Sequence, residues 1–276
     1  GGSVEDAALP ELALQYVDYA LWQRGALGAV LDVYRDYWRD HLHEGALPVL
    51  EMPLDLPRPA AQTFNGDATS FAVRADDTTH LEHLARSHGA TLFQLALALW
   101  AVLLCRHAGQ DEVVVGSPYH GRDAAGTEML IGYFVNVLAL RVEVLRGGST
   151  ASSVVRNARD VAAGGMRHAA LPFQQIVHEL LPKRVYDVSR NAVFQAMIGW
   201  GADADERNVQ SSSANVGGTL EMLPAGRGEH LVAKVELTLS ASVGSAGGID
   251  GGIEFNTDLY VRESVERLAA RLPVLV

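Results

Sequence analysis

The residues best suited to chemistry in this 276-residue sequence are a histidine and an arginine, His120 and Arg122, in the segment GSPYHGRDAAGTE. The segment follows the apolar run EVVVG, which is typical of a short buried strand, and Gly121 indicates a fixed turn. Loops that leave buried strands often carry functional side chains. The Arg122 guanidinium could form a bidentate pair with a carboxylate and hold two elements in register, or it could be a surface arginine beside Asp123.

A second candidate is Asn136, which interrupts the apolar run IGYFVNVLALR over residues 131–141. Apart from this amide, the run predicts a strand that is covered on both faces. A buried amide without partners costs roughly 1–3 kcal/mol, so we expect the Asn136 side chain to be bonded to something specific. The sequence leaves two options open, namely the backbone of a neighbouring loop or a ligand.

A third candidate is His168, which lies in RHAALPFQQIVHEL just before a short helix that begins at Pro172. It could cap that helix or act as a general base, and the structural role is favoured because no acid or nucleophile accompanies it in the sequence. No GxSxG, GxGxxG, Walker A or HExxH motif is present. We predict no metal site, because cysteine and carboxylate ligands at metal-binding spacing are missing beside the closest histidine pairs, His41/His43 and His80/His83.

The composition argues against several classes of protein. The 22 basic and 33 acidic residues give a net charge of −11 without a basic stripe, so nucleic acid is not an expected partner. The single cysteine, Cys105, excludes an intramolecular disulfide and fits a reducing cytosol, and we expect a cytoplasmic protein. The opening GGSVEDAALPEL does not resemble a signal peptide, and residues 91–105 are shorter than the about 20 residues that span a membrane.

Hydrophobic periodicity predicts the helices and strands that must position these side chains. We expect two amphipathic helices within residues 11–43, separated near Gly25 and Gly28, followed by an extended proline-rich connector over residues 48–59. Further helices are predicted after Asp77, from Thr91, near 151–163, at 171–181 and at the C-terminus, with strands at 112–116, 131–141, 191–200, 231–243 and 252–260. The last two strands should be antiparallel, and residues 201–218 have the composition of a loop. This mixture of helices and strands favours an α/β sandwich, in which helices cover a mixed sheet.

Four segments, taken in order, resemble the condensation domains of nonribosomal peptide synthetases. They are YVDYALWQR (16–24), IGYFVNVLALR (131–141), HAALPFQQIV (168–177) and SRNAVFQAM (189–197). They are similar to that family's Tyr-x-Asp-Tyr-Ala-x-Trp-Gln, Ile-Gly-x-Phe-Val-Asn-Thr-x-x-x-Arg, His-Gln-Asp-x-Pro-Phe-Glu and Ser-Arg-Asn-Pro-x-Phe-Gln motifs. The sequence departs from these motifs at Val137 for Thr, Ala169 and Ala170 for Gln and Asp, and Ala192 for Pro.

The resemblance implies a fold like chloramphenicol acetyltransferase and a domain of two such lobes. The family's catalytic His-His-x-x-x-Asp-Gly motif lies in the N-terminal lobe and does not occur in this sequence. We therefore expect no catalytic residue here, and we expect the chain to be inactive alone. Residues 1–60 would comprise aromatic-rich helices and the connector from the inter-lobe region, and residues 61–276 the C-terminal lobe. Tyr19 and Trp22 would be exposed where the other lobe packs.

The activity implied by the resemblance is amide formation between a donor acyl thioester and an acceptor aminoacyl thioester, in a tunnel between the lobes. Both substrates would be carried on the phosphopantetheine of donor and acceptor carrier proteins, with no cofactor bound by the chain itself. By the family pattern, Arg122 would pair with the Asp of the absent catalytic motif. Gly121, Asn136, Arg190 and Asn191 would lie at the tunnel wall or the lobe interface.

Three other functions stay open at the level of sequence. One is a non-catalytic recruitment module of the same fold, which the altered HAALPF motif favours. Another is an epimerisation or heterocyclisation domain, against which IGYFVN argues because those relatives usually carry a Phe-Thr variant there. The last is an acyltransferase that uses coenzyme A, which a separate N-terminal lobe and binding of coenzyme A would support.

Overall fold

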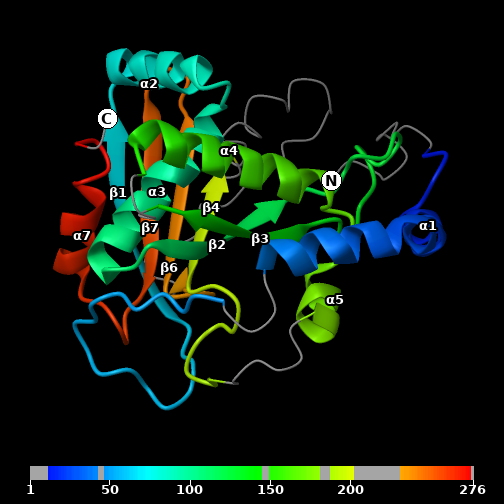
Figure 1. Ribbon diagram of the computed structural model, residues 1–276, viewed down its shortest axis with the longest axis horizontal. Helices are drawn as coiled ribbons and strands as arrows, with labels where there is room; N and C mark the ends of the chain where they lie inside the picture. The colour runs from blue at the N-terminus through cyan, green and yellow to red at the C-terminus, as the bar shows by residue number, and fades with distance from the viewer. Residues whose placement is uncertain (1–11, 43–46, 145–148, 181–186, 202–230, 275–276) are drawn as a thin grey trace, which may run out of the picture.

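A single mixed β-sheet forms the centre of the molecule in the computed structural model, which describes residues 12–42, 47–144, 149–180, 187–201 and 231–274 (Figure 1). The strand order is β3-β2-β4-β6-β7-β1-β5. The pairs β2–β4 and β4–β6 are parallel and the other neighbouring pairs are antiparallel. The strands are β1 (Asn65–Val73), β2 (Glu112–Tyr119), β3 (Asn136–Glu143), β4 (Ala196–Trp200), β5 (Leu231–Val232), β6 (Leu237–Val243) and β7 (Ile249–Asn256).

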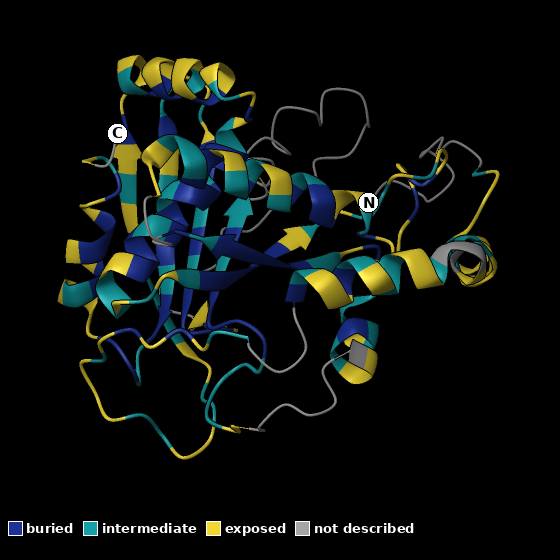
Figure 2. Ribbon diagram, viewed as in Figure 1, coloured by how far each residue is buried: buried dark blue, intermediate teal, exposed yellow. Residues whose placement is uncertain are grey.

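Helices pack against this sheet, and apolar side chains of the strands and helices form one buried core between them (Figure 2). The helices are α1 (Tyr16–Leu42), α2 (Ala75–Ser87), α3 (Leu92–Ala108), α4 (Ala151–Arg167), α5 (Phe173–Gln175), which continues into a π-helical turn (Ile176–Leu180), and α7 (Arg262–Ala269). Figure 1 shows α1 running along the β3 edge of the sheet. The predicted combination of mixed sheet and covering helices is therefore observed.

The apolar segment 91–105 is a core helix, as the sequence predicted. Thr91 and Gln94 form a capping box at the start of α3, and Gly109, with φ +66°, ends the helix in the left-handed region. Cys105 is fully buried in it, and burial raises the pKa of its thiol to about 12. Within the described residues, no single helix is long and apolar enough to cross a membrane, although α2 and α3, bent by 96°, meet the length and composition limits together.

The proline-rich connector is extended, as predicted, and side chains of the chain itself hold it to the lobe. The Leu50 amide donates to Gln195 Oε1 at 2.7 Å. Arg58 makes a bidentate pair with Glu236, with N–O distances of 2.7 and 3.1 Å. Both side chains are largely buried, so this pair fixes the connector to the loop between β5 and β6.

Two predictions about the elements were wrong in ways that matter for the site. The two helices expected within residues 11–43 are one continuous helix, and the Cα positions of Gly25 and Gly28 face open space. The predicted strand 131–141 begins only at Asn136, and residues 131–135 form an irregular segment. Ile131, expected to be buried, is 94% exposed.

Two further boundaries differ from the prediction. The predicted strand 191–200 begins at Ala196, because residues 191–195 form a turn that Asn191 caps with its side chain. The predicted strand 231–243 is divided into β5 and β6. The β6–β7 hairpin is antiparallel as predicted, whereas the predicted loop 201–218 lies almost entirely outside the described residues.

Candidate functional site

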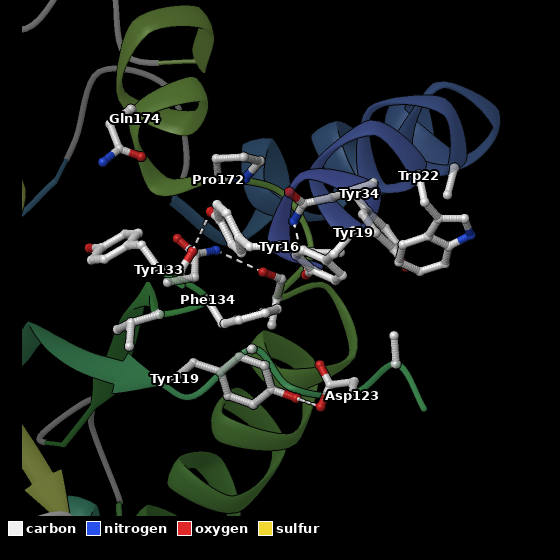
Figure 3. A pocket seen from close by; sticks show the side chains of 18 residues that line it. Tyr16, Tyr19, Trp22, Tyr34, Tyr119, Asp123, Tyr133, Phe134, Pro172 and Gln174 are labelled. Atoms are coloured by element: carbon white, nitrogen blue, oxygen red, sulfur yellow. Dashed lines mark hydrogen bonds between the residues drawn. The ribbon is translucent and has the colours of Figure 1, made fainter. Parts of the chain in front are cut away.

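An open pocket of about 350 Å³ lies beside the β3 edge of the sheet (Figure 3). Four segments line it: helix α1, the end of β2 with the loop after it (residues 119–124), the segment 133–136, and the connection from α4 into α5 (residues 169–174). Three of these segments belong to sequence motifs singled out above, although they are up to about 150 positions apart in the chain. The fold therefore gathers separate motifs at one cavity.

Seven of the eighteen residues that line the pocket are aromatic (Figure 3). The Tyr16 hydroxyl donates to the Tyr133 carbonyl oxygen at 2.7 Å, which ties α1 to the segment before β3. Phe134 contacts the rings of Tyr16 and Tyr19, with centroid distances of 5.1 and 4.7 Å. Trp22, one turn further along α1, packs on Tyr19 at 5.8 Å and is 58% exposed.

Two glycines permit this close packing. A Cβ atom at Gly132 would collide with the Tyr16 ring, so only glycine lets α1 approach the segment before β3. Gly121 has φ +66°, and a Cβ there would collide with the Phe134 carbonyl. The predicted turn at Gly121 therefore lies at the pocket, where it brings the loop after β2 against Phe134.

Asn136 is the polar clamp of the pocket wall. Its Nδ2 donates to the carbonyl oxygens of Ala169 and Leu171 at 2.7 and 2.8 Å, and its Oδ1 accepts from the Phe173 amide at 3.0 Å. The amide side chain thus satisfies three backbone groups of the connection from α4 to α5. Of the two options left open by the sequence, the structure selects the backbone of a neighbouring segment.

Arg122 is anchored through one nitrogen of its guanidinium group. Nη1 donates to the carbonyl oxygens of Thr127 and Leu130, and the group lies 4.2 Å from the centre of the Phe134 ring. Nε and Nη2 have no hydrogen-bond partner, and no carboxylate pairs with Arg122, within the part of the chain that the structure describes. The neighbouring Asp123 does not form the ion pair that its sequence position allowed.

A tyrosine and an aspartate that sequence reasoning did not single out as a pair meet at the floor of the pocket (Figure 3). The Tyr119 hydroxyl donates to Asp123 Oδ1 at 2.6 Å. Burial, and then this hydrogen bond, raise the pKa of Tyr119. Burial, and then the charge of Asp123, also raise the pKa of Tyr19, so both phenols stay protonated at neutral pH. The sequence feature that could have indicated the pair Tyr119 and Asp123 is their position at the end of β2 and in the turn that follows it.

The two candidate histidines have structural contacts. His168 Nδ1 lies 2.8 Å from the Gly164 carbonyl oxygen, and its ring stacks on Tyr37 of α1 at 3.9 Å. His168 therefore helps to dock α1 on α4, in line with the favoured structural role. His120 Nδ1 accepts from the Arg122 amide at 3.0 Å, which stabilises the turn at Gly121.

Arg190 and Asn191 do not line this pocket. Arg190 pairs with Glu51 and Asp187, in each case at 2.8 Å, and so fixes the connector to the turn before β4. The Asn191 side chain caps that same turn. The structure thus brings Gly121 and Asn136 together at the pocket and Arg122 beside them, and it places Arg190 and Asn191 on the connector side. Among the described residues, no group of His, Cys, Asp or Glu is arranged to hold a metal ion.

Comparison with known proteins gives a consistent result. A family model described as "Condensation domain" matches residues 3–276. The chain is 38% identical over 266 residues to Malpinin synthetase of Mortierella alpina and, over the same length, to a Plipastatin synthase polypeptide of Bacillus subtilis (strain 168). Each alignment covers 96% of this chain but only 3% and 7% of the respective relative, so the chain spans a small part of these proteins.

A solved structure has the same fold. The X-domain from teicoplanin biosynthesis is 24% identical and superposes with a TM-score of 0.78, covering 96% of this chain and 59% of that one. This likeness confirms the predicted fold class.

Proposed function

The chain belongs to the condensation domain family, and on that premise we propose that it is the C-terminal lobe of a domain that forms an amide bond. In this proposal, a nonribosomal peptide synthetase joins a donor acyl thioester to an acceptor aminoacyl thioester, each carried on the phosphopantetheine of a carrier protein. The lobe comprises residues 61–276, and residues 1–60 belong to the inter-lobe region. The buried single cysteine fits a reducing compartment, and we place the protein in the cytoplasm.

The observation that carries the proposal is the convergence of family motifs on one open pocket. Parts of YVDYALWQR, IGYFVN and HAALPF line the same cavity of about 350 Å³. Hydrogen bonds of Asn136 and Tyr16 lock the three segments together. Because substrates of this reaction must be held in a defined orientation, a preorganised wall built from these motifs is what the proposed role requires.

The reaction sets clear demands on the site. The acceptor amine nitrogen attacks the donor thioester carbon, so that a C–N bond forms, the C–S bond breaks, the thiol leaves and the amine proton passes to a base. Among the described residues that line the pocket, no histidine, cysteine or serine is present. In the proposed role this wall positions the substrates, and the base is supplied by the N-terminal lobe, whose His-His-x-x-x-Asp-Gly motif the resemblance implies.

Arg122 is the proposed link between the two lobes. Its Nη1 donates to two carbonyl groups and its Cζ lies 4.2 Å from the centre of the Phe134 ring, whereas Nε and Nη2 have no hydrogen-bond partner among the described residues. In this orientation Nε and Nη2 could together bind a carboxylate from outside the lobe. We propose that this carboxylate is the Asp of the catalytic motif, and that Arg122 acts as a positioning residue.

Exposed apolar side chains support a partner on the same face. Met129, Ile131 and Tyr133 are 69%, 94% and 71% exposed, and they lie in or next to the segment that contributes to the pocket. Together with Trp22 they form what we call the apolar rim of the pocket. Several large apolar side chains exposed in and next to one segment indicate an interaction surface, which we assign to the N-terminal lobe.

The test is made in the complete parent protein, loaded with donor and acceptor carrier proteins, with the amide product measured by mass spectrometry. Wild-type protein should form the amide. Arg122→Lys keeps the charge but loses the paired N–H donors of the guanidinium, and we expect kcat to fall by about 10-fold. In Arg122→Gln, which also loses the charge, kcat should fall by about 100-fold. The KM for the acceptor should be unchanged in both variants. Arg106→Gln, on α3 outside the pocket, is the control.

Two results would oppose the proposal. Loaded carrier proteins that never yield an amide would favour a recruitment module, and acyl transfer from coenzyme A would favour the acyltransferase. If amide formation is normal and Arg122→Gln matches wild type, the proposed function stands and the role of Arg122 is wrong.

A further inference from the structure

The pocket contains a single formal charge. Of the eighteen residues that line it, all described, only Asp123 carries one. The rest of the lining is aromatic, apolar or polar without charge. The pKa values of Tyr19 and Tyr119 are raised from an ordinary value that already lies well above neutral pH, so both hydroxyls are uncharged. A carboxylate on the wall of this cavity offers a negative charge that a cationic ligand could approach, and the resemblance does not account for it.

The Asp123 carboxylate has capacity for a further partner. Oδ1 accepts the Tyr119 hydroxyl at 2.6 Å, which fixes the orientation of the carboxylate, and Oδ2 has no hydrogen-bond partner within the described residues. Among the described residues, the adjacent Arg122 makes no ion pair with it, since that guanidinium donates to the carbonyl groups of Thr127 and Leu130. The charge is thus oriented, unpaired and open to the cavity.

The aromatic wall suits the same kind of ligand. Tyr19 and Trp22 of α1 present their rings on the other side of the cavity (Figure 3). Aromatic faces attract cations through their quadrupole, and a carboxylate in the same cavity adds a coulombic attraction of its own. We propose that Asp123, with Tyr19 and Trp22, forms a subsite for an ammonium group of the acceptor substrate. This inference rests on the proposed function, because it is that reaction which brings an amine to the cavity.

An ammonium group could come from the acceptor's α-amine or from its side chain. Three probes distinguish these sources when they are titrated into the 276-residue chain and followed by amide NMR shifts. L-norleucine methylamide carries only the α-ammonium, Nα-acetyl-L-lysine methylamide carries only the side-chain ammonium, and Nα-acetyl-L-norleucine methylamide carries neither. We expect one of the two cationic probes to bind about tenfold more tightly than the neutral one, and its identity gives the source.

Two variants complete the experiment. Asp123→Asn keeps the shape of the side chain and should remove the preference for the cation. Asp76→Asn, on α2 and outside the pocket, makes the same change in net charge and should retain it. Equal binding of all three probes would overturn the inference, as would an unchanged preference in Asp123→Asn or an equal loss in Asp76→Asn.

A second measurement, in the parent protein, separates this inference from the proposed function and does not require the chain to fold alone. With acceptors loaded on the carrier protein, Asp123→Asn should raise acceptor KM by about tenfold and leave kcat within twofold. Amide formation with unchanged KM would contradict the subsite and leave the proposed function intact. Absence of amide formation in the wild type would contradict the proposed function, whatever the binding of the probes shows.

Discussion

The connector (residues 48–59) and residues 129–135 of the apolar rim both have irregular backbone, yet their side chains differ in whether they find partners within the chain. Along the connector, polar groups find partners in the lobe. Asp55 accepts from the Val261 amide at 3.0 Å and from the Ser264 hydroxyl at 2.7 Å, and Arg58 pairs with the buried Glu236. The connector is therefore held by what this chain supplies.

Two large side chains of the rim are instead mostly exposed to solvent. Ile131 and Tyr133 are 94% and 71% exposed, although the backbone beside them is fixed by the hydrogen bond from Tyr16 to the Tyr133 carbonyl. The segment is thus held in place while its apolar side chains point to solvent. The contrast separates groups that stabilise the lobe from groups that are presented to something outside it.

The largest expected effect concerns the connector. Glu236→Ala removes the partner of Arg58, whose side chain is 15% exposed, and leaves a buried charge unpaired. We expect the free energy of unfolding to fall by about 3 kcal/mol, measured by urea denaturation. Glu263→Ala, on the exposed side of α7, should change it by less than about 0.5 kcal/mol. Equal effects of the two substitutions would show that the connector is not held by this ion pair.

An intermediate effect is expected at the pocket wall itself. Asn136→Ala leaves three backbone groups of residues 169–173 without their partners, and should cost about 2 kcal/mol. Hydrogen exchange at the Phe173 amide should accelerate more than exchange in β6, because the loss is local. The exposed Gln174, which also lines the pocket, provides the control, and its replacement by Ala should leave both measurements near wild type. Unchanged exchange at Phe173 would refute the clamp.

The smallest effect on stability is expected at the rim. The double substitution Ile131→Ser and Tyr133→Ser removes apolar side chains that are already in solvent, so the free energy of unfolding should change by less than about 0.5 kcal/mol. In the parent protein, amide formation should nevertheless fall by more than about 10-fold, because the contact between the lobes is weakened. If the isolated chain loses stability and the parent protein keeps its activity, the rim stabilises this lobe and does not bind the N-terminal lobe.

The comparison also explains which parts of the fold could be predicted from the sequence. Helix α3 was predicted well because its cap, apolar content and terminal glycine all lie within one segment. The residues at 131–135 were predicted to be a buried strand because an apolar pattern indicates burial without saying against which partner. Helix α1 was divided in the prediction at Gly25 and Gly28, yet a glycine in a helix costs only about 1 kcal/mol and does not interrupt its hydrogen bonds.

In the candidate site, too, local signals could be predicted from the sequence, whereas contacts between distant segments could not. The sequence indicated that Asn136 must have a partner, but its partners lie 33 to 37 positions away, and only the fold identifies them. Gly121 and Arg122 were identified from a turn and a motif, both local signals. Tyr119 and Asp123 were not identified as a pair, because their importance comes from the cavity, which exists only once α1 has packed against the loop after β2.

The central claim, that this lobe is one half of an amide-forming site, is tested most directly by comparing the 276-residue chain with its complete parent domain. Both are given the same donor and acceptor carrier proteins, loaded with their thioesters, and the amide product is measured by mass spectrometry. We predict product from the parent domain and none above background from the chain alone. Product from the isolated chain at a comparable rate, or none from the parent domain, would contradict the claim.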